Sequence, residues 1–158
     1  MSIAANAMTD QSEKAYRQVV NSWAMYDWAN SAFVTTIMAA MFPPFYRSLV
    51  IATGLSKADA TAYWAYTASL ALFLIALLAP VLGAISDHTG GKKLYIAFFA
   101  GLGAVATALF VFLGEDTYML ASVLFILGNI GFAGSIIFYE SLLPHIAKRD
   151  DIDQISTR

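Results

Sequence analysis

The sequence predicts an all-α membrane protein with four transmembrane helices, on the evidence of its composition and of four long uncharged intervals. Of its 158 residues, 59% are hydrophobic and 13% are charged, whereas a soluble domain is about half apolar and about a quarter charged. Each uncharged interval exceeds the roughly 18 residues that mark a candidate membrane span. The expected spans, which together form a membrane domain over residues 23–143, are about 23–46, 60–86, 94–114 and 117–140.

The first span follows a polar segment of mixed charge, residues 1–22. We expect this segment to be cytoplasmic and to contain a short helix. Two placements are open: a solvated tail, or a helix whose weak apolar face, formed by Ala15, Val19 and Trp23, lies along the membrane surface.

Two prolines and a capping pattern mark the boundary between the first and second spans. Pro43 and Pro44 are expected to end the first span, because proline breaks the helical hydrogen-bond ladder. Residues 47–60 are then expected to form a loop. Ser56, followed three residues later by Asp59, is the expected N-cap of the second span.

The distribution of basic residues predicts the orientation of the chain in the membrane. Seven of the nine lysines and arginines fall in the N-terminal segment, the second loop and the C-terminal segment 144–158. Only Arg47 and Lys57 fall in the other two loops. Because basic residues stay on the cytoplasmic side, both termini are expected in the cytoplasm. The expected location is the inner (plasma) membrane of a bacterium.

Composition and motifs argue against several other classes of protein. The net charge of −2 gives no footprint for nucleic-acid binding, and the absence of cysteine excludes disulfides and thiolate metal sites. The two histidines lack a metal-binding spacing, and no nucleophile, base and acid are grouped. We therefore expect no enzyme activity, metal site or cofactor, and as partners the lipid bilayer and a small-molecule solute.

The first span carries a polar strip, formed by Asp27, Asn30, Ser31 and Thr35. Their spacing of three, four and eight residues puts them on one helix face. Polar groups are costly in lipid, so such a strip normally faces a bundle interior or a watery cavity. One hypothesis is that these residues line a transport path, with Asp27 pairing with an amine or carrying a coupling proton. The other is that Asp27 lies at the membrane interface and stabilises the helix N-terminus.

Glu140 closes the fourth span near the expected cytoplasmic face. It can pair with Lys92 or Lys93 across that face, or simply end the helix at the interface with no further role.

The third and fourth spans are rich in small residues at regular spacing. Alanines recur every four residues from Ala100 to Ala108, and glycines every three from Gly128 to Gly134. Small residues let helix backbones approach closely in lipid, so we expect helix packing here. A glycine stripe along a substrate path is the alternative.

The loop between the second and third spans is GAISDHTGGKK, at residues 83–93. Its glycines and charged residues are more regularly placed than a turn requires. Gly83 can let another helix come close, and Asp87 can cap a neighbouring helix N-terminus. Gly90 and Gly91 can take positive φ in a tight turn. Lys92 and Lys93 are expected to hold the turn in the cytoplasm.

This loop resembles the signature loop between the second and third helices of major facilitator superfamily transporters. The matching positions are Gly83, Asp87, Gly90, Lys92 and Lys93. His88 departs from the usual arginine, and Gly91 from the usual basic residue. The resemblance implies that the aspartate contacts a helix in the other half of the transporter and helps to hold the outward-open state.

Further stretches resemble one branch of that superfamily, the permeases similar to the fungal autophagy-related vacuolar amino-acid effluxer. They are MYDWANSAF (25–33), FYESLLPHIA (138–147) and DQISTR (153–158). The resemblance makes Tyr26, Asp27, Trp28 and Asn30 the hallmark of the first helix. Glu140 stands where the branch often has asparagine. The implied substrates are amino acids or similar small polar solutes.

The resemblance also implies a larger fold than four spans. Family members have twelve spans in two halves, so the chain is expected to be a partial N-terminal half that needs the remaining helices and is incomplete alone. Two alternatives are open. The chain can be a complete four-span transporter that works as an oligomer, with Asp27 as its essential carboxylate. It can also be a membrane partner protein that does not transport.

Overall fold

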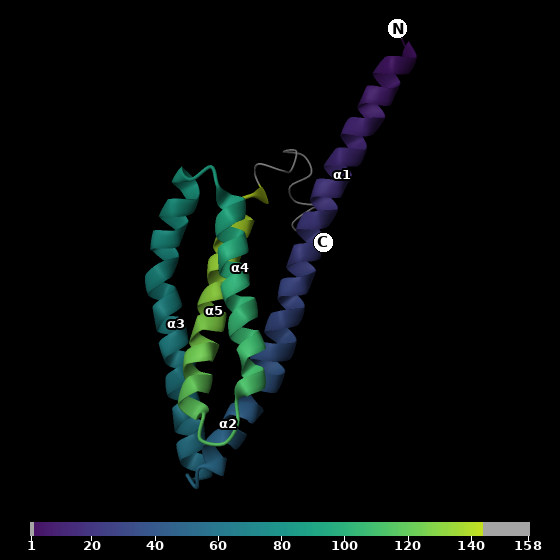
Figure 1. Ribbon diagram of the computed structural model, residues 1–158. Helices are drawn as coiled ribbons and strands as arrows, with labels where there is room; N and C mark the ends of the chain where they lie inside the picture. The colour runs from purple at the N-terminus through teal and green to yellow at the C-terminus, as the bar shows by residue number, and fades with distance from the viewer. Residues whose placement is uncertain (1, 144–158) are drawn as a thin grey trace.

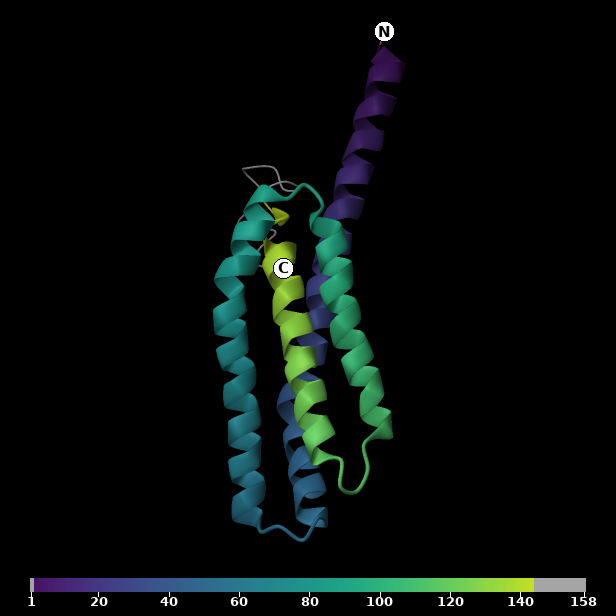
Figure 2. The ribbon, with the colours of Figure 1, turned by 60° about the vertical axis from the view of Figure 1, so that its left-hand side comes forward.

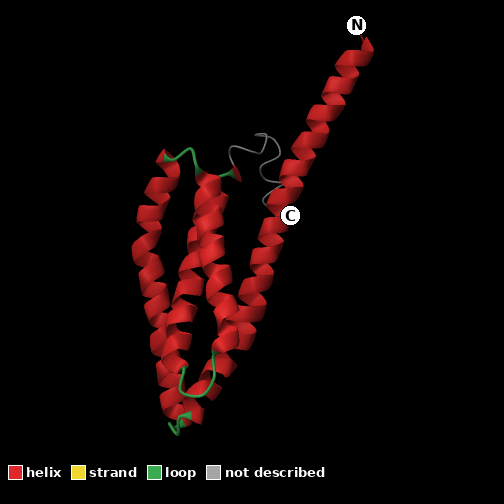
Figure 3. Cartoon of the chain, in the orientation of Figure 1, coloured by secondary structure: helices red, strands yellow, loops and turns green. Residues whose placement is uncertain are grey.

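The computed structural model describes residues 2–143, with side chains described from Glu13 onward. Over that range the chain is helical and contains four helical stretches long and apolar enough to cross a membrane (Figures 1 and 3). This confirms the predicted all-α fold. The elements are α1 (Ser2–Ala32), the π-helix η1 (Phe33–Met41), α2 (Phe42–Ala52), α3 (Lys57–His88), α4 (Lys92–Ala108), the 3₁₀ helix η2 (Leu109–Phe112) and α5 (Tyr118–Glu140).

The first membrane-crossing element is one uninterrupted helical rod made of α1, η1 and α2. The expectation that Pro43 and Pro44 end it is wrong, because both lie in the first turn of α2, where a missing N–H costs no hydrogen bond. The π-helix leads into that turn: the Phe42 N–H donates to the carbonyl of Ile37, five residues back. The loop expected over 47–60 is correspondingly short and comprises residues 53–56.

The turn from α2 to α3 shows the predicted capping. The Ser56 Oγ accepts from the Asp59 N–H at 3.1 Å, and the Asp59 carboxylate accepts from the Ser56 N–H at 3.1 Å. This reciprocal pair is a capping box, which confirms Ser56 as the N-cap. Gly54 takes the left-handed conformation, with φ of 86°, that lets the chain reverse between the two helices.

The segment before Trp23 continues the axis of the first span and is not a separate short helix. Figure 1 shows α1 as a straight helix that projects past the other helices at its N-terminal end. A helix lying in the membrane plane would need a bend near Trp23, and α1 has none there.

Helix α5 lies at the centre of the bundle. Figure 2 shows it between α3 and α4, with the rod behind it. In the most apolar stretch of α5, 39% of the residues are buried, against 6% in α3. Large apolar side chains on α3 and α4 are exposed, among them Leu72, Phe73, Leu94 and Phe98. These outer faces suit contact with lipid tails or with further helices.

Glycines bring α4 and α5 into close contact. A Cβ added at Gly131 would lie 2.5 Å from the Gly103 nitrogen and 2.7 Å from the Phe99 carbonyl oxygen. A Cβ at Gly134 would overlap the Phe99 ring. The packing interpretation of the glycine series is therefore correct at Gly131 and Gly134. A Cβ at Gly128 would have no atom within 4 Å.

At the opposite end of the bundle from the 83–93 loop, three hydroxyl groups join three helices. The Tyr46 hydroxyl lies 2.7 Å from the Ser122 Oγ and 3.2 Å from the Thr67 Oγ1. Thr67 and Ser122 are 2.9 Å apart. Tyr46 is fully buried and packs in an aromatic cluster with Phe42 and Trp64. The network gives each buried hydroxyl a partner from another helix, which stabilises helix association in lipid.

Replacing Gly131 with alanine is expected to destabilise the bundle by about 1–3 kcal/mol, because the added methyl group overpacks the contact with α4. The measurement is the unfolding free energy in detergent, followed by far-ultraviolet circular dichroism. Gly128→Ala is the matched control, since its methyl group meets open space and should change stability by less than about 0.5 kcal/mol. Equal losses for the two variants would contradict this account of the contact.

Replacing Tyr46 with phenylalanine is expected to cost about 0.6 kcal/mol, and at most about 1.7 kcal/mol, because it removes one interhelical hydroxyl from the cluster. Tyr66→Phe makes the same chemical change on a side chain that is 72% exposed and should be neutral. The same unfolding assay applies, and a neutral Tyr46→Phe would show that the cluster does not stabilise the bundle.

Candidate functional site

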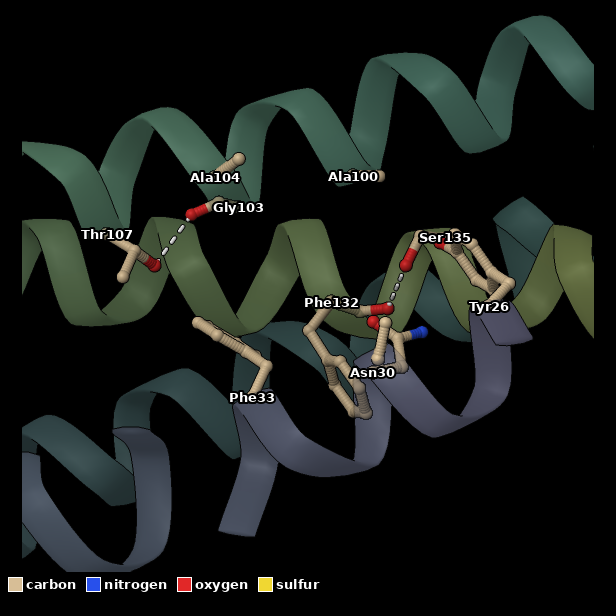
Figure 4. Close-up of a pocket in the computed structure, with 10 residues that line it drawn as sticks. Tyr26, Asn30, Phe33, Ala100, Gly103, Ala104, Thr107, Phe132 and Ser135 are labelled. Atoms are coloured by element: carbon tan, nitrogen blue, oxygen red, sulfur yellow. Dashed lines mark hydrogen bonds between the residues drawn. The ribbon is translucent and has the colours of Figure 1, made fainter. Parts of the chain in front are cut away.

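A cavity of about 280 Å³ lies between the rod, α4 and α5. Figure 4 shows the side chains around it. Among the residues predicted for the substrate path and the first-helix hallmark, Tyr26 and Asn30 line it. The other lining residues are Ala29, Phe33, Ala100, Gly103, Ala104, Thr107, Phe132 and Ser135.

Helical spacing explains which residues of the rod reach the cavity. Tyr26, Asn30 and Phe33 follow one another at four and three residues, so they share a helix face. Phe33 meets Phe132 of α5, with ring centroids 6.3 Å apart. On the α4 side, Ala100 and Ala104 line the cavity. These two alanines were expected to pack helices together, but the close contact with α5 is made by Gly103 instead.

A second cavity, of about 530 Å³, lies nearer the 83–93 loop and shares Tyr26 with the first. Trp23 and Lys93 line it as well. Tyr139 forms its wall: the Tyr139 ring stacks on Trp23 at 4.7 Å and lies 4.8 Å from the Tyr26 ring. The Tyr139 hydroxyl donates to the Trp23 carbonyl oxygen at 2.8 Å. Tyr139 thus joins α5 to α1.

Three buried polar atoms on the rod have no hydrogen-bond partner within the described part of the chain. They are the Trp23 Nε1, the Tyr26 hydroxyl and the Asn30 Nδ2. All three residues line one or both of the cavities. A buried polar group without a partner is costly, above all in a membrane. This side of α1 therefore has unused hydrogen-bonding capacity.

The remaining residues of the predicted polar strip lie elsewhere on the helix. Asp27, Ser31 and Thr35 are exposed and line neither cavity. The Thr35 hydroxyl donates to the Ser31 carbonyl at 2.8 Å. Trp28, the other hallmark residue, is 69% exposed. The structure thus divides the hallmark between an inner side, with Tyr26 and Asn30, and an outer side, with Asp27 and Trp28.

The signature loop is mostly open to its surroundings. Asp87, Gly90 and Lys93 are exposed, and a Cβ at Gly83 would have no atom within 4 Å. Asp87 makes no hydrogen bond to another described residue. Neither Gly90 nor Gly91 uses its freedom to take positive φ. Gly91 has φ of −93°, and the turn contains extended Thr89 in place of a left-handed glycine.

Lys92 of the signature loop fixes the start of α4 to the end of α5. Its Nζ donates to the Ser141 carbonyl at 3.0 Å, at the C-terminus of α5 where a cation is favoured. The Ser86 Oγ, buried at the end of α3, donates to the Ser141 Oγ at 2.7 Å. Glu140 is exposed, and within the described residues it forms no ion pair with Lys92 or Lys93.

Several residues of these sites were not singled out from the sequence. Ser86 and Ser141 are small polar residues with no motif around them. The only signal in the sequence is that they lie next to Asp87 and Glu140, at the ends of spans. Ser135 and Thr107 lie within uncharged spans, where their hydroxyls donate to the carbonyls of Phe132 and Gly103. Their presence at the cavity depends on helix rotation, which a helix with apolar residues on every side does not reveal.

Comparison with known proteins gives consistent matches over most of the chain. The family model described as "Vacuole effluxer Atg22 like" matches residues 15–157. The MFS-type transporter YxiO of Bacillus subtilis is 36% identical over 145 residues, which cover 92% of this chain and 34% of YxiO. Autophagy-related protein 22 of Coccidioides immitis is 30% identical over 129 residues, which cover 82% of this chain and 21% of that protein.

The chain therefore spans about a third of YxiO and about a fifth of the fungal protein. No solved structure matches the chain.

Replacing Lys92 with methionine is expected to cost about 0.3–1 kcal/mol, because it removes a cation from the C-terminus of α5. Lys93→Met is the matched control: it removes the same positive charge from the same loop but leaves the contact with Ser141. The measurement is the difference in unfolding free energy between the two variants, and no difference would show that the Lys92 contact does not stabilise the bundle.

Proposed function

The chain belongs to the Atg22-like family of vacuole effluxers, and we propose that it forms the N-terminal part of a secondary transporter of the major facilitator type. It is an integral membrane protein with four membrane-crossing helices, and its relatives include an MFS-type transporter. The proposed substrates are amino acids or similar small polar solutes, and the remaining helices of the transporter are the proposed partners.

The observation that carries this proposal is the division of polar residues on the first span. Asn30 lines an interior cavity, whereas Asp27, Ser31 and Thr35 are exposed on the surface of the four-span bundle. Uncompensated polar groups at membrane depth do not face lipid; they face protein or water. A transport path along the side of the rod that carries Asp27, Ser31 and Thr35, closed by further helices, accounts for these exposed polar residues.

In such a transporter, two halves move about a site near the middle of the membrane. The exposed strip of Asp27, Ser31 and Thr35 then belongs to the path that opens to each side in turn. Asp27 has the chemistry to pair with a cationic amine or to carry a coupling proton. We propose that both termini lie in the cytoplasm and that the membrane is the bacterial inner membrane, in keeping with the seven basic residues on that side.

An oligomer of four-span subunits is the second candidate, because a second copy of the chain is another way to cover the exposed polar strip. The two candidates differ in what they need for activity. Vesicles containing the 158-residue chain are compared with vesicles containing the same chain extended by any coding sequence that follows it. Radiolabelled amino-acid uptake by the extended form alone supports the proposal. Uptake by the 158-residue chain overturns it in favour of the oligomer.

Replacing Asp27 with asparagine is expected to reduce the initial rate of uptake at least about tenfold, because the change removes the charge and the proton-carrying capacity while keeping the shape. The assay uses whichever form transports, reconstituted in vesicles after its membrane insertion has been checked. Asp116→Asn is the matched control, since Asp116 lies in the turn between η2 and α5 and should leave uptake unchanged. Full activity of Asp27→Asn would remove this residue from the mechanism.

A further inference from the structure

The three unpartnered polar atoms lie on one side of α1. Trp23, Tyr26 and Asn30 are spaced by three and four residues, which places them one above another on the helix. The indole Nε1 and the amide Nδ2 can only donate hydrogen bonds, and the Tyr26 hydroxyl can donate as well. No acceptor for any of them is present among the described residues. The helix therefore presents a row of donors that lacks an acceptor.

The charged side chain that lines the cavities favours a negatively charged hydrogen-bond acceptor. Lys93 lines the second cavity, and within the described part of the chain no carboxylate lines either one. Asp27 and Glu140, which directly follow the lining residues Tyr26 and Tyr139, are exposed and line neither cavity. A cationic group would find no carboxylate among the described lining residues, whereas an anionic oxygen would find donors and one cation.

The first cavity has one polar and one apolar end. Figure 4 shows Tyr26, Asn30 and Ser135 gathered at one end and Phe33, Ala104 and Thr107 toward the other. The Thr107 and Ser135 hydroxyls both donate to carbonyls of their own helices at 2.8 Å, so the unpartnered donors of this cavity are those of Tyr26 and Asn30 at the first end. A ligand at the second end therefore meets mainly apolar surface. This arrangement fits a small molecule with a polar head and an apolar body.

We propose that the cleft between α1, α4 and α5 binds the carboxylate end of a small amphipathic solute. The Tyr26 hydroxyl and the Asn30 amide donate to the carboxylate oxygens, and Trp23 donates from the adjoining cavity, where Lys93 adds positive charge. The apolar body lies beside Phe33 and Ala104. This inference rests on the proposed transport function and specifies which end of the substrate the four-span bundle recognises.

The direct test is calorimetric titration of the 158-residue chain in nanodiscs of neutral phosphatidylcholine. Three probes separate the charged groups of an amino acid: leucine, 4-methylpentanoate, which has the carboxylate but no amine, and leucinamide, which has the amine but no carboxylate. We expect leucine and 4-methylpentanoate to bind with similar affinity. Leucinamide should bind at least about tenfold more weakly, because it cannot form the charge-assisted hydrogen bonds.

Two variants test the donors named in the proposal. Tyr26→Phe removes the hydroxyl but keeps the ring that packs on Tyr139, and Asn30→Leu replaces the amide with an apolar group of similar size. Each should weaken leucine binding about tenfold or more. Tyr66→Phe, which makes the same change on an exposed residue of α3 that lines neither cavity, should bind leucine like the unchanged chain.

Three results would overturn the inference: equal binding of leucinamide and leucine, unchanged binding by both donor variants, or no saturable binding by a chain whose circular dichroism shows it folded. Nanodiscs with added phosphatidylglycerol distinguish a lipid headgroup from a free solute. If the anionic lipid displaces leucine and binds through the same two donors, the site belongs to a lipid phosphate instead. Amino-acid transport by the extended chain is a separate readout, so the transport proposal stands if this inference fails.

Discussion

The lack of water in the hydrocarbon core of a bilayer is the constraint on which this structure depends, because every polar group there needs a partner inside the protein or in a watery space. The backbone meets it by forming helices over almost all of residues 2–143. The π-helix before Pro43 lets the first rod accommodate two prolines without an abrupt break. Side-chain hydroxyls meet it by bonding to their own helix, as Thr107 does, or to one another across helices, as Tyr46, Thr67 and Ser122 do.

Polar groups without such a partner are concentrated on the first span, and they form two sets with different implications. On the inner side, Trp23, Tyr26 and Asn30 have donors without acceptors beside two cavities. On the outer side, Asp27 and Ser31 are exposed on the surface of the four-span bundle. The first set suits a bound ligand. The second set needs additional protein, or a water-filled path, to cover it. We therefore place the functional part of the molecule on and beside the first-helix hallmark rather than on the signature loop.

Local signals in the sequence were sufficient for the four spans and for the capping box at Ser56 and Asp59, because hydrophobic length and cap chemistry act over a few residues. They were insufficient wherever the outcome depended on contacts between distant segments. Asn30 and Ser31 are adjacent, yet about 100° of helix rotation puts one in the cavity and leaves the other exposed. The glycine series identified one side of the α4–α5 contact, but its partner Gly103 becomes evident only when the helices are seen together. Nothing in the sequence around Tyr139 indicates that its hydroxyl donates to the Trp23 carbonyl, because this bond joins positions far apart in the chain.

Accessibility of the first span to water is the measurement that tests this account most directly. The chain has no cysteine, so single cysteines can be introduced at Ser31 and Thr35 in the transporting form. Leu77, an exposed apolar residue of α3, is the comparison position. The account predicts that a membrane-impermeant thiol reagent labels the cysteines at 31 and 35, that excess substrate slows the labelling, and that the cysteine at 77 stays unlabelled. Equal protection of all three positions would contradict it, because the exposed strip of the first span would then face lipid rather than a transport path.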